Sequence, residues 1–237
     1  MALSWVILSF WLGACTPSLS ASIIDTDGIY ETRPIHHPDG IGKFYMGREI
    51  AQVMGYEGGQ VAGAIQSGCR TTPAGDRALG LKPTDTVADI GAGTGYFTFR
   101  ISPLVPEGKV LAVDIQPEML DLIDFVKQQE QISNVETILG TVDTPNLPTD
   151  SIDLALMVDA YHEFTNPREM MEHLMDALRV GGRVVLVEYR GENPLIPIKG
   201  LHKMTEKQVQ KEMEAVGFTW KETSSILPQQ HLMIFEK

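Results

Sequence analysis

The chain has 237 residues, of which 43% are hydrophobic and 21% are charged, a composition typical of a globular protein with one α/β domain of ordinary size. The formal net charge of −12 argues against a nucleic-acid partner, because few cations are present to replace the counterions of a phosphate backbone. The two cysteines, Cys15 and Cys69, fit neither a disulfide framework nor a zinc site.

Residues 1–22 allow two interpretations. Met1 to Cys15 is almost wholly apolar, and Leu12-Gly13-Ala14-Cys15 is similar to a bacterial lipobox, which predicts a signal segment and membrane association through a lipid on Cys15. The apolar run is short for a bilayer span and contains no Lys or Arg. An N-terminal extension, or an upstream start codon, is therefore the alternative.

Residues 23–80 are expected to form an N-terminal region that covers the main domain and contributes to substrate binding. Ile35 to Gly40 has the composition of a loop, and the apolar residues between Phe44 and Met54 predict a helix that ends at Gly55. Residues 58–80 are rich in Gly, Ala and Thr, which predicts a loop or a weak helix.

Residues 81–237 show alternating strand and helix patterns, as expected for a largely parallel sheet. A short helical segment over Phe97–Ile101 follows the first of the predicted strands. Apolar runs predict strands at Thr86–Ile90, Lys109–Asp114, Val135–Gly140, Ile152–Val158, Arg183–Tyr189, Thr219–Ser225 and Leu232–Glu236.

Three longer helices are predicted between these strands. The first spans Pro117–Gln129, where apolar residues recur with a helical period. The second has Asn166 as its N-cap and is expected to end at Gly181-Gly182. Thr205 and Gln208 form a capping box at the start of the third.

A glycine-rich turn joins the first predicted strand to the helix that follows it. Asp89 ends the apolar run, Gly91, Gly93 and Gly95 alternate with other residues, and Asp114 ends the next apolar run 19 residues after Gly95. Glycines permit positive φ and a close approach of the backbone to a ligand. This layout is typical of a βαβ unit that binds an adenosine-containing cofactor.

The spacing of the glycines distinguishes between such cofactors. In a dinucleotide-binding turn the last glycine of the pattern would fall at position 96 or 98. This chain has Tyr96 and Thr98 there, so it departs from the dinucleotide pattern. The stretch instead resembles motif I of class I S-adenosylmethionine-dependent methyltransferases. That resemblance implies that Asp89 and the loop of Gly91, Gly93 and Gly95 face the amino-acid end of the cofactor.

Two further blocks resemble the same family. Asp114-Ile115 is similar to its second motif, which implies that Asp114 accepts both ribose hydroxyls and that Ile115 also contacts the cofactor; a helix cap before Pro117 is the alternative role for Asp114. Asp143, followed by Leu147-Pro148, resembles the stretch whose acid meets the adenine amino group. A plain loop acid is the alternative there.

The segment after the fourth strand gathers Asp159, Tyr161, His162 and Glu163. It resembles the methyltransferase type 11 and ubiquinone-pathway C-methyltransferase groups, in which this turn faces the reacting methyl group. His162 is the candidate general base, because its ordinary pKa lies near neutrality. Asp159 and Tyr161 complete the candidate catalytic set, and Asp159 is also a candidate cofactor contact. His162 alternatively orients the loop or lines the pocket.

Other polar residues are expected to line the pocket: Tyr45, Arg48, Glu188-Tyr189-Arg190 and His202-Lys203. Residues with metal-binding side chains show no convincing ligand spacing, so no metal is expected. His36-His37-x-Asp39 is interpreted as a solvated loop.

The resemblance implies an α/β, Rossmann-like seven-stranded sheet with one antiparallel strand and helices on both faces. It further implies transfer of a methyl group from S-adenosylmethionine to a small-molecule acceptor. A non-catalytic S-adenosylmethionine-binding protein and a NAD-dependent oxidoreductase are the alternatives. The donor is made in the cytoplasm, which favours that compartment, whereas lipidation at Cys15 would anchor the chain to a membrane. The oligomeric state is not indicated.

Overall fold

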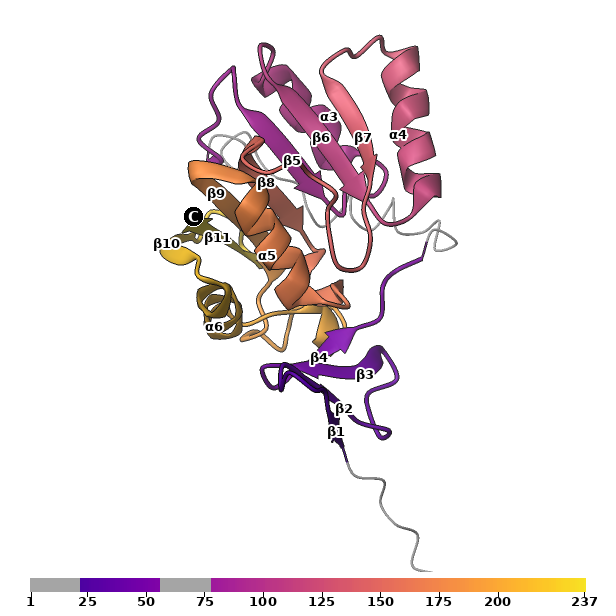
Figure 1. Ribbon diagram of the computed structural model, residues 1–237, viewed down its shortest axis with the longest axis vertical. Coiled ribbons are helices and arrows are strands. Elements are labelled where there is room, and N and C mark those ends of the chain that lie inside the picture. The colour runs from indigo at the N-terminus through magenta and orange to yellow at the C-terminus, as the bar shows by residue number, and fades with distance from the viewer. Residues whose placement is uncertain (1–21, 56–77) are drawn as a thin grey trace, which may run out of the picture.

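The computed structural model describes residues 22–55 and 78–237 (Figure 1). The predicted lipobox at Cys15 and most of the predicted loop at residues 58–80 lie outside these ranges and stay predictions. Within them, no helix is both long enough and apolar enough to cross a bilayer. The described strands form a four-stranded sheet and a seven-stranded sheet.

The seven-stranded sheet has the order β10-β11-β9-β8-β5-β6-β7. β11 runs antiparallel to both of its neighbours, β9 and β10, whereas the pairs from β9 to β7 are parallel. The strands are β5 (Thr86–Ile90), β6 (Lys109–Asp114), β7 (Val135–Leu139), β8 (Ile152–Val158), β9 (Leu178–Tyr189), β10 (Thr219–Ser224) and β11 (Gln230–Glu236). This confirms the predicted fold class.

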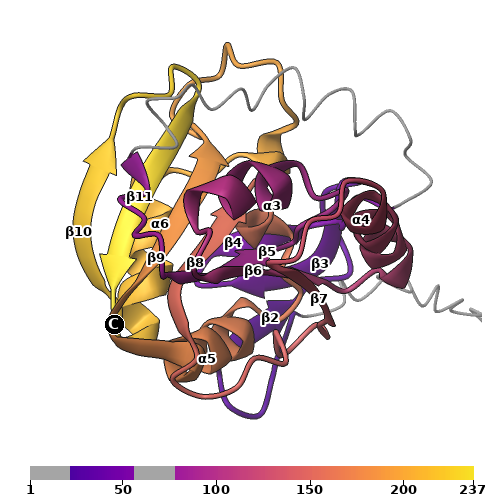
Figure 2. The same cartoon turned by 90° about the horizontal axis from the view of Figure 1, so that it is seen from above.

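Helices cover both faces of this sheet (Figure 2). Successive residues of a strand point to opposite faces, so in β5 Val87 packs with α3 (Tyr96–Ile101) and α4 (Pro117–Gln129), while Ala88 packs with α5 (Pro167–Ala177) and α6 (Glu206–Val216). Such strands are buried on both faces, which explains their nearly continuous apolar sequence.

The helix predictions are correct for α4 and partly correct for the others. Thr205 caps α6 by accepting a hydrogen bond from the backbone N–H of Gln208. Asn166 is the N-cap residue of α5, but its side chain makes no capping bond. The predicted end of α5 at the glycine pair is wrong, because the helix ends at Ala177. Leu178, whose side chain is fully buried, already pairs with Ile152 as the first residue of β9.

The N-terminal region forms a small antiparallel sheet instead of the predicted helix. Its strands are β1 (Ile23–Ile24), β2 (Tyr30–Thr32), β3 (Gly40–Tyr45) and β4 (Arg48–Ala51). The prediction of a helix from Phe44 to Met54 is wrong because Met46 and Gly47 both have positive φ, 50° and 95°. Two such residues form a tight hairpin turn, which reverses the chain between β3 and β4.

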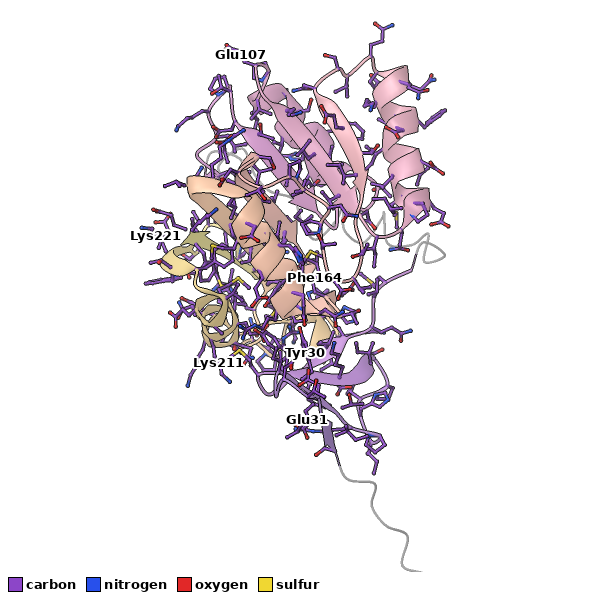
Figure 3. The ribbon with its side chains drawn as sticks, in the orientation of Figure 1. Tyr30, Glu31, Glu107, Phe164, Lys211 and Lys221 are labelled. Atoms are coloured by element: carbon purple, nitrogen blue, oxygen red, sulfur yellow. The ribbon has the colours of Figure 1, made fainter. Side chains whose placement is uncertain are left out.

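The small sheet docks beside α5 and α6, and Tyr30 lies at this boundary (Figure 3). The central contact is an ion pair between Arg48 on β4 and Glu212 on α6, with Nε–Oε1 and Nη2–Oε2 distances of 2.8 and 2.9 Å. The Glu212 side chain is fully buried and that of Arg48 is 9% exposed. Arg48 also donates to the carbonyl of His162, 3.0 Å away, so the small sheet holds the segment after β8.

Arg48→Met is expected to lower the free energy of unfolding by about 3–5 kcal/mol, because it leaves the buried Glu212 carboxylate without its cation. Arg48→Met combined with Glu212→Leu should cost less than Arg48→Met alone. Urea denaturation of the three proteins measures these differences.

The matched control is Arg33→Met, which breaks the ion pair with Glu31 on the surface, where both side chains are at least 31% exposed. Arg33→Met should leave the denaturation midpoint nearly unchanged. A loss equal to that of Arg48→Met would show that burial does not set the strength of these pairs.

Candidate functional site

A cavity lies at the carboxyl ends of β5, β6 and β8, where ligands bind in open α/β sheets. Its wall consists of the glycine turn and the segments after β4, β6, β7 and β8. The lining residues are Val53, Met54, Ile90, Gly91, Gly93, Val113, Asp114, Ile115, Gln116, Met119, Gly140, Thr141, Val142, Val158, Asp159, Ala160, Glu163, Phe164, Thr165 and Met170.

The glycine turn brings the backbone close to its neighbours. A Cβ atom on Gly91 would lie 2.8 Å from the Cβ of Ala160, so a side chain here would push the turn away from the end of β8. Gly95 has a φ of 85° and precedes α3 as its N-cap. A Cβ there would lie 2.8 Å from the Phe99 ring and 2.9 Å from Ile123, within the core. Of the three predicted glycines, Gly91 and Gly93 line the cavity and Gly95 does not.

Asp114 is fixed at the cavity edge by two backbone amides. The N–H of Gly93 donates to Oδ2 and the N–H of Gln116 donates to Oδ1, both at 2.9 Å. Burial raises the pKa of the Asp114 carboxyl, although these hydrogen bonds oppose the rise. Asp114 closes the turn before α4, while Gln116 is the N-cap residue of that helix. Each carboxylate oxygen keeps a lone pair for a further donor.

Asp89 and Asp143, two predicted cofactor contacts, are not among the residues that line the cavity. The buried Asp89 carboxylate lies beneath the glycine turn and accepts a hydrogen bond from the Thr98 hydroxyl at 2.6 Å. Burial raises the pKa of Asp89 to about 6. Asp143 accepts a hydrogen bond from the Asn166 side chain, and its neighbours Thr141 and Val142 take its place in the cavity wall.

The segment after β8 brings Asp159, Ala160 and Glu163 to the cavity. Asp159 has a positive φ of 49°, and its Oδ2 accepts a hydrogen bond from the Gln230 side chain at 2.9 Å. Together with Asp114, this places three carboxylates on the cavity wall. The site therefore suits a ligand with positive charge.

His162 and Tyr161 are not among the cavity-lining residues, contrary to the expectation that they face the reacting methyl group. Both are buried in the 3₁₀ helix η2 (Tyr161–Glu163). His162 Nδ1 lies 2.7 Å from Glu188 Oε2, and Nε2 lies 3.1 Å from His202 Nδ1. Burial alone would lower the pKa of His162, but Glu188 and Glu163 raise it to about 10. Glu188 and His202 enclose the ring outside the cavity wall, so the structure favours an orienting role for His162 over that of a general base.

Glu163 and Met54 belong to the site, although no separate role is predicted for either from the sequence. The backbone N–H of Met54 donates to Glu163 Oε2 at 3.1 Å, and the Gln116 side chain donates to the Met54 carbonyl at 3.3 Å. Burial alone would raise the pKa of Glu163, but His162 and His202 lower it to about 2. These contacts hold the segment after β4 against the cavity, and no local sequence pattern indicates them.

The other polar residues expected in the pocket are not in its wall. Tyr45 belongs to the core of the small sheet, and Glu188 holds His162. Arg190 donates to the carbonyl of Leu227, and Lys203 donates to that of Ile196. The remaining members of that set, also absent from the wall, are Arg48, Tyr189 and His202.

Comparison with known proteins identifies a family match over the part of the chain that forms the seven-stranded sheet. A model of the methyltransferase domain family matches residues 81–235. The crystal structure of a SAM-dependent methyltransferase from Aquifex aeolicus has a TM-score of 0.64 and 22% identity, and the match covers 68% of this chain and 86% of that one. At this identity the likeness shows the shared fold.

Two curated relatives each match part of the chain. An uncharacterized methyltransferase-like protein of Schizosaccharomyces pombe is 30% identical over 142 residues, 60% of this chain and 53% of that protein. A ubiquinone/menaquinone biosynthesis C-methyltransferase of Ectopseudomonas mendocina is 26% identical over 120 residues, 49% of this chain and 47% of that protein. The match thus spans about half the length of these relatives.

The buried Asp89 predicts a pH dependence of stability. Its pKa in the folded chain, about 6, lies above the ordinary value of 3.8, so the folded state holds the proton more tightly than the unfolded state. The free energy of unfolding should therefore fall as the pH rises from about 4 to about 6, by about 3 kcal/mol. Asp89→Asn should remove most of this slope and be more stable than wild type at pH 8. Urea denaturation at a series of pH values measures this dependence for both proteins. Equal slopes of unfolding free energy against pH in wild type and Asp89→Asn would contradict the raised pKa of Asp89.

Proposed function

Because the chain belongs to the methyltransferase domain family, whose cofactor is S-adenosylmethionine, we propose that it transfers a methyl group from S-adenosylmethionine to a small-molecule acceptor. The proposal depends chiefly on the Asp114 carboxylate, which two backbone amides fix at the edge of the cavity. The name of the E. mendocina relative and the negative charge of the chain support a small acceptor.

The residues at the cavity fit this cofactor. A Cβ on Gly93 would meet no protein atom within 4 Å, so the turn leaves open space where a ligand can approach the backbone. The Asp114 carboxylate has lone pairs for two neighbouring ribose hydroxyls. Asp159 supplies further negative charge among the residues that line the cavity, which favours a cationic donor.

When bound, S-adenosylmethionine would supply an electrophilic methyl group, which the acceptor would attack in line with the carbon–sulfur bond as S-adenosylhomocysteine leaves. The chain's own contribution is to hold donor and acceptor together, which can lower the barrier by about 7–11 kcal/mol. Asp114 and the glycine turn bind the donor, while Phe164, Met170 and Met54 form an apolar part of the wall that excludes water. We assign no general base to His162, because Glu188 and His202 enclose it.

Asp114→Asn is expected to weaken S-adenosylmethionine binding about 10–100-fold, because it removes a charge-assisted hydrogen-bond acceptor. Isothermal titration calorimetry measures the affinity. Asp121→Asn is the matched control, because Asp121 is exposed on α4, outside the cavity wall. Unchanged affinity in Asp114→Asn would remove Asp114 from the binding site.

An acceptor screen with a labelled methyl donor tests turnover. The full chain should release S-adenosylhomocysteine only when a suitable small acceptor is present. Donor binding without release in any acceptor pool would favour a non-catalytic binding protein. Binding of NAD in place of S-adenosylmethionine would support the oxidoreductase alternative.

A further inference from the structure

Three potential metal ligands meet at the edge of the cavity, although they come from two separate segments. His162 and Glu163 belong to η2, and His202 ends the 3₁₀ helix η3 (Gly200–His202). Each side chain offers one ligand atom, and the three atoms lie within 4.8 Å of one another. The sequence spacing did not indicate this group, because 40 residues separate the two histidines.

The distances between these atoms match those around a small divalent ion. His162 Nε2 lies 3.1 Å from His202 Nδ1 and 3.7 Å from Glu163 Oε1, while His202 Nδ1 lies 3.2 Å from Glu163 Oε1. Ligand atoms about 2.0–2.2 Å from a tetrahedral metal lie about 3.3–3.6 Å apart. One ion can therefore contact all three atoms after only a small adjustment of the side chains.

On His162 and Glu163, the atom that would not bind the metal already has a hydrogen-bond partner. His162 Nδ1 lies 2.7 Å from Glu188 Oε2, a contact that directs Nε2 toward the group. The Met54 amide donates to Glu163 Oε2. Glu163 Oε1 is buried and makes no hydrogen bond, although His202 Nδ1 is close. Carboxylates that hold a ligating histidine by its second nitrogen are typical of metal centres.

The local charge also favours a divalent cation. Glu163 and Glu188 place two carboxylates next to His162, with side chains that are 12% and 0% exposed. Arg48, which approaches the same segment, is paired with Glu212. A dication that binds both imidazoles and displaces the proton of His162 would balance the two carboxylates in a region where unpaired charge is costly.

We propose that His162, Glu163 and His202 form a binding site for a divalent transition-metal ion of the zinc type. Two imidazoles and one carboxylate select such ions over Mg²⁺ and Ca²⁺, which prefer oxygen ligands. Three protein ligands leave a coordination position free, as in catalytic zinc sites. Because Glu163 lines the cavity, that position is available to an oxygen atom from there, either water or a hydroxyl or carboxylate of the acceptor. Only the assignment to the acceptor rests on the proposed function.

Metal titration tests the site without any measurement of activity. Tag-free full-length protein, stripped with a chelator, should bind one equivalent of Co²⁺ with visible absorption bands, and Zn²⁺ should displace it whereas Mg²⁺ should not. Glu163→Gln and His202→Gln should each weaken Co²⁺ binding more than about 100-fold. Glu188→Gln, which alters only the support of His162, should weaken it about 10–100-fold.

His173→Ala is the matched control, because His173 is exposed on α5 and is not one of the three ligands. It should leave Co²⁺ affinity unchanged. The proposal is wrong if wild-type protein binds neither Co²⁺ nor Zn²⁺ at millimolar concentration, or if His173→Ala weakens binding as much as His202→Gln does. The wild-type titration decides the matter even if a variant fails to fold.

Asp114→Asn separates this proposal from the proposed function. It should weaken S-adenosylmethionine binding and leave Co²⁺ binding intact, because Asp114 is not one of the three ligands. Metal binding without S-adenosylmethionine binding by wild type would contradict the proposed function alone. S-adenosylmethionine binding without metal binding would contradict the metal site alone.

Discussion

The cavity depends on the buried carboxylate of Asp114 and the backbone amides of Gly93 and Gln116 that bind it. A carboxylate at the end of a buried strand is destabilising unless hydrogen-bond donors replace the lost water. Here the glycine turn after β5 supplies one donor and the entry to α4 supplies the other. The same contacts fix the two segments relative to each other, so the fold and the candidate binding site share one set of hydrogen bonds.

A second group of buried charges supports the segment after β8, which forms another part of the cavity lining. Glu188 on β9 binds His162, and Arg48 from the small sheet donates to the carbonyl of the same residue. Glu212 neutralises Arg48 from α6. The small sheet thus contributes to the site, because Arg48 helps to fix the segment that carries Asp159 and Glu163 to the cavity.

The sequence predicts the parts of the structure that depend on local patterns. Continuous apolar runs identified β5, β6 and β8, and the spacing of Gly93 and Asp114 placed both at one cavity. The β3–β4 hairpin was missed because its turn uses Met46, a residue that rarely adopts positive φ. The end of α5 was missed because burial of Leu178 in the sheet outweighs the helix-ending tendency of the glycine pair.

Contacts between distant segments account for the other differences. Nothing near His162 in the sequence shows that Glu188 and His202 enclose it, so its ordinary pKa suggested a base where the structure has a buried, paired imidazole. Asp143 likewise turns to Asn166, a contact formed only when α5 packs beside the loop after β7. Residue type indicated the chemistry of these side chains, but tertiary packing determines which of them reach the cavity.

A crystal structure of the chain with S-adenosylhomocysteine is the most direct test of this account. Both ribose hydroxyls should donate to the Asp114 carboxylate while the Gly93 amide keeps its hydrogen bond to the same group. A ligand bound elsewhere, or an Asp114 side chain turned away from the ribose, would contradict the assignment of the cavity.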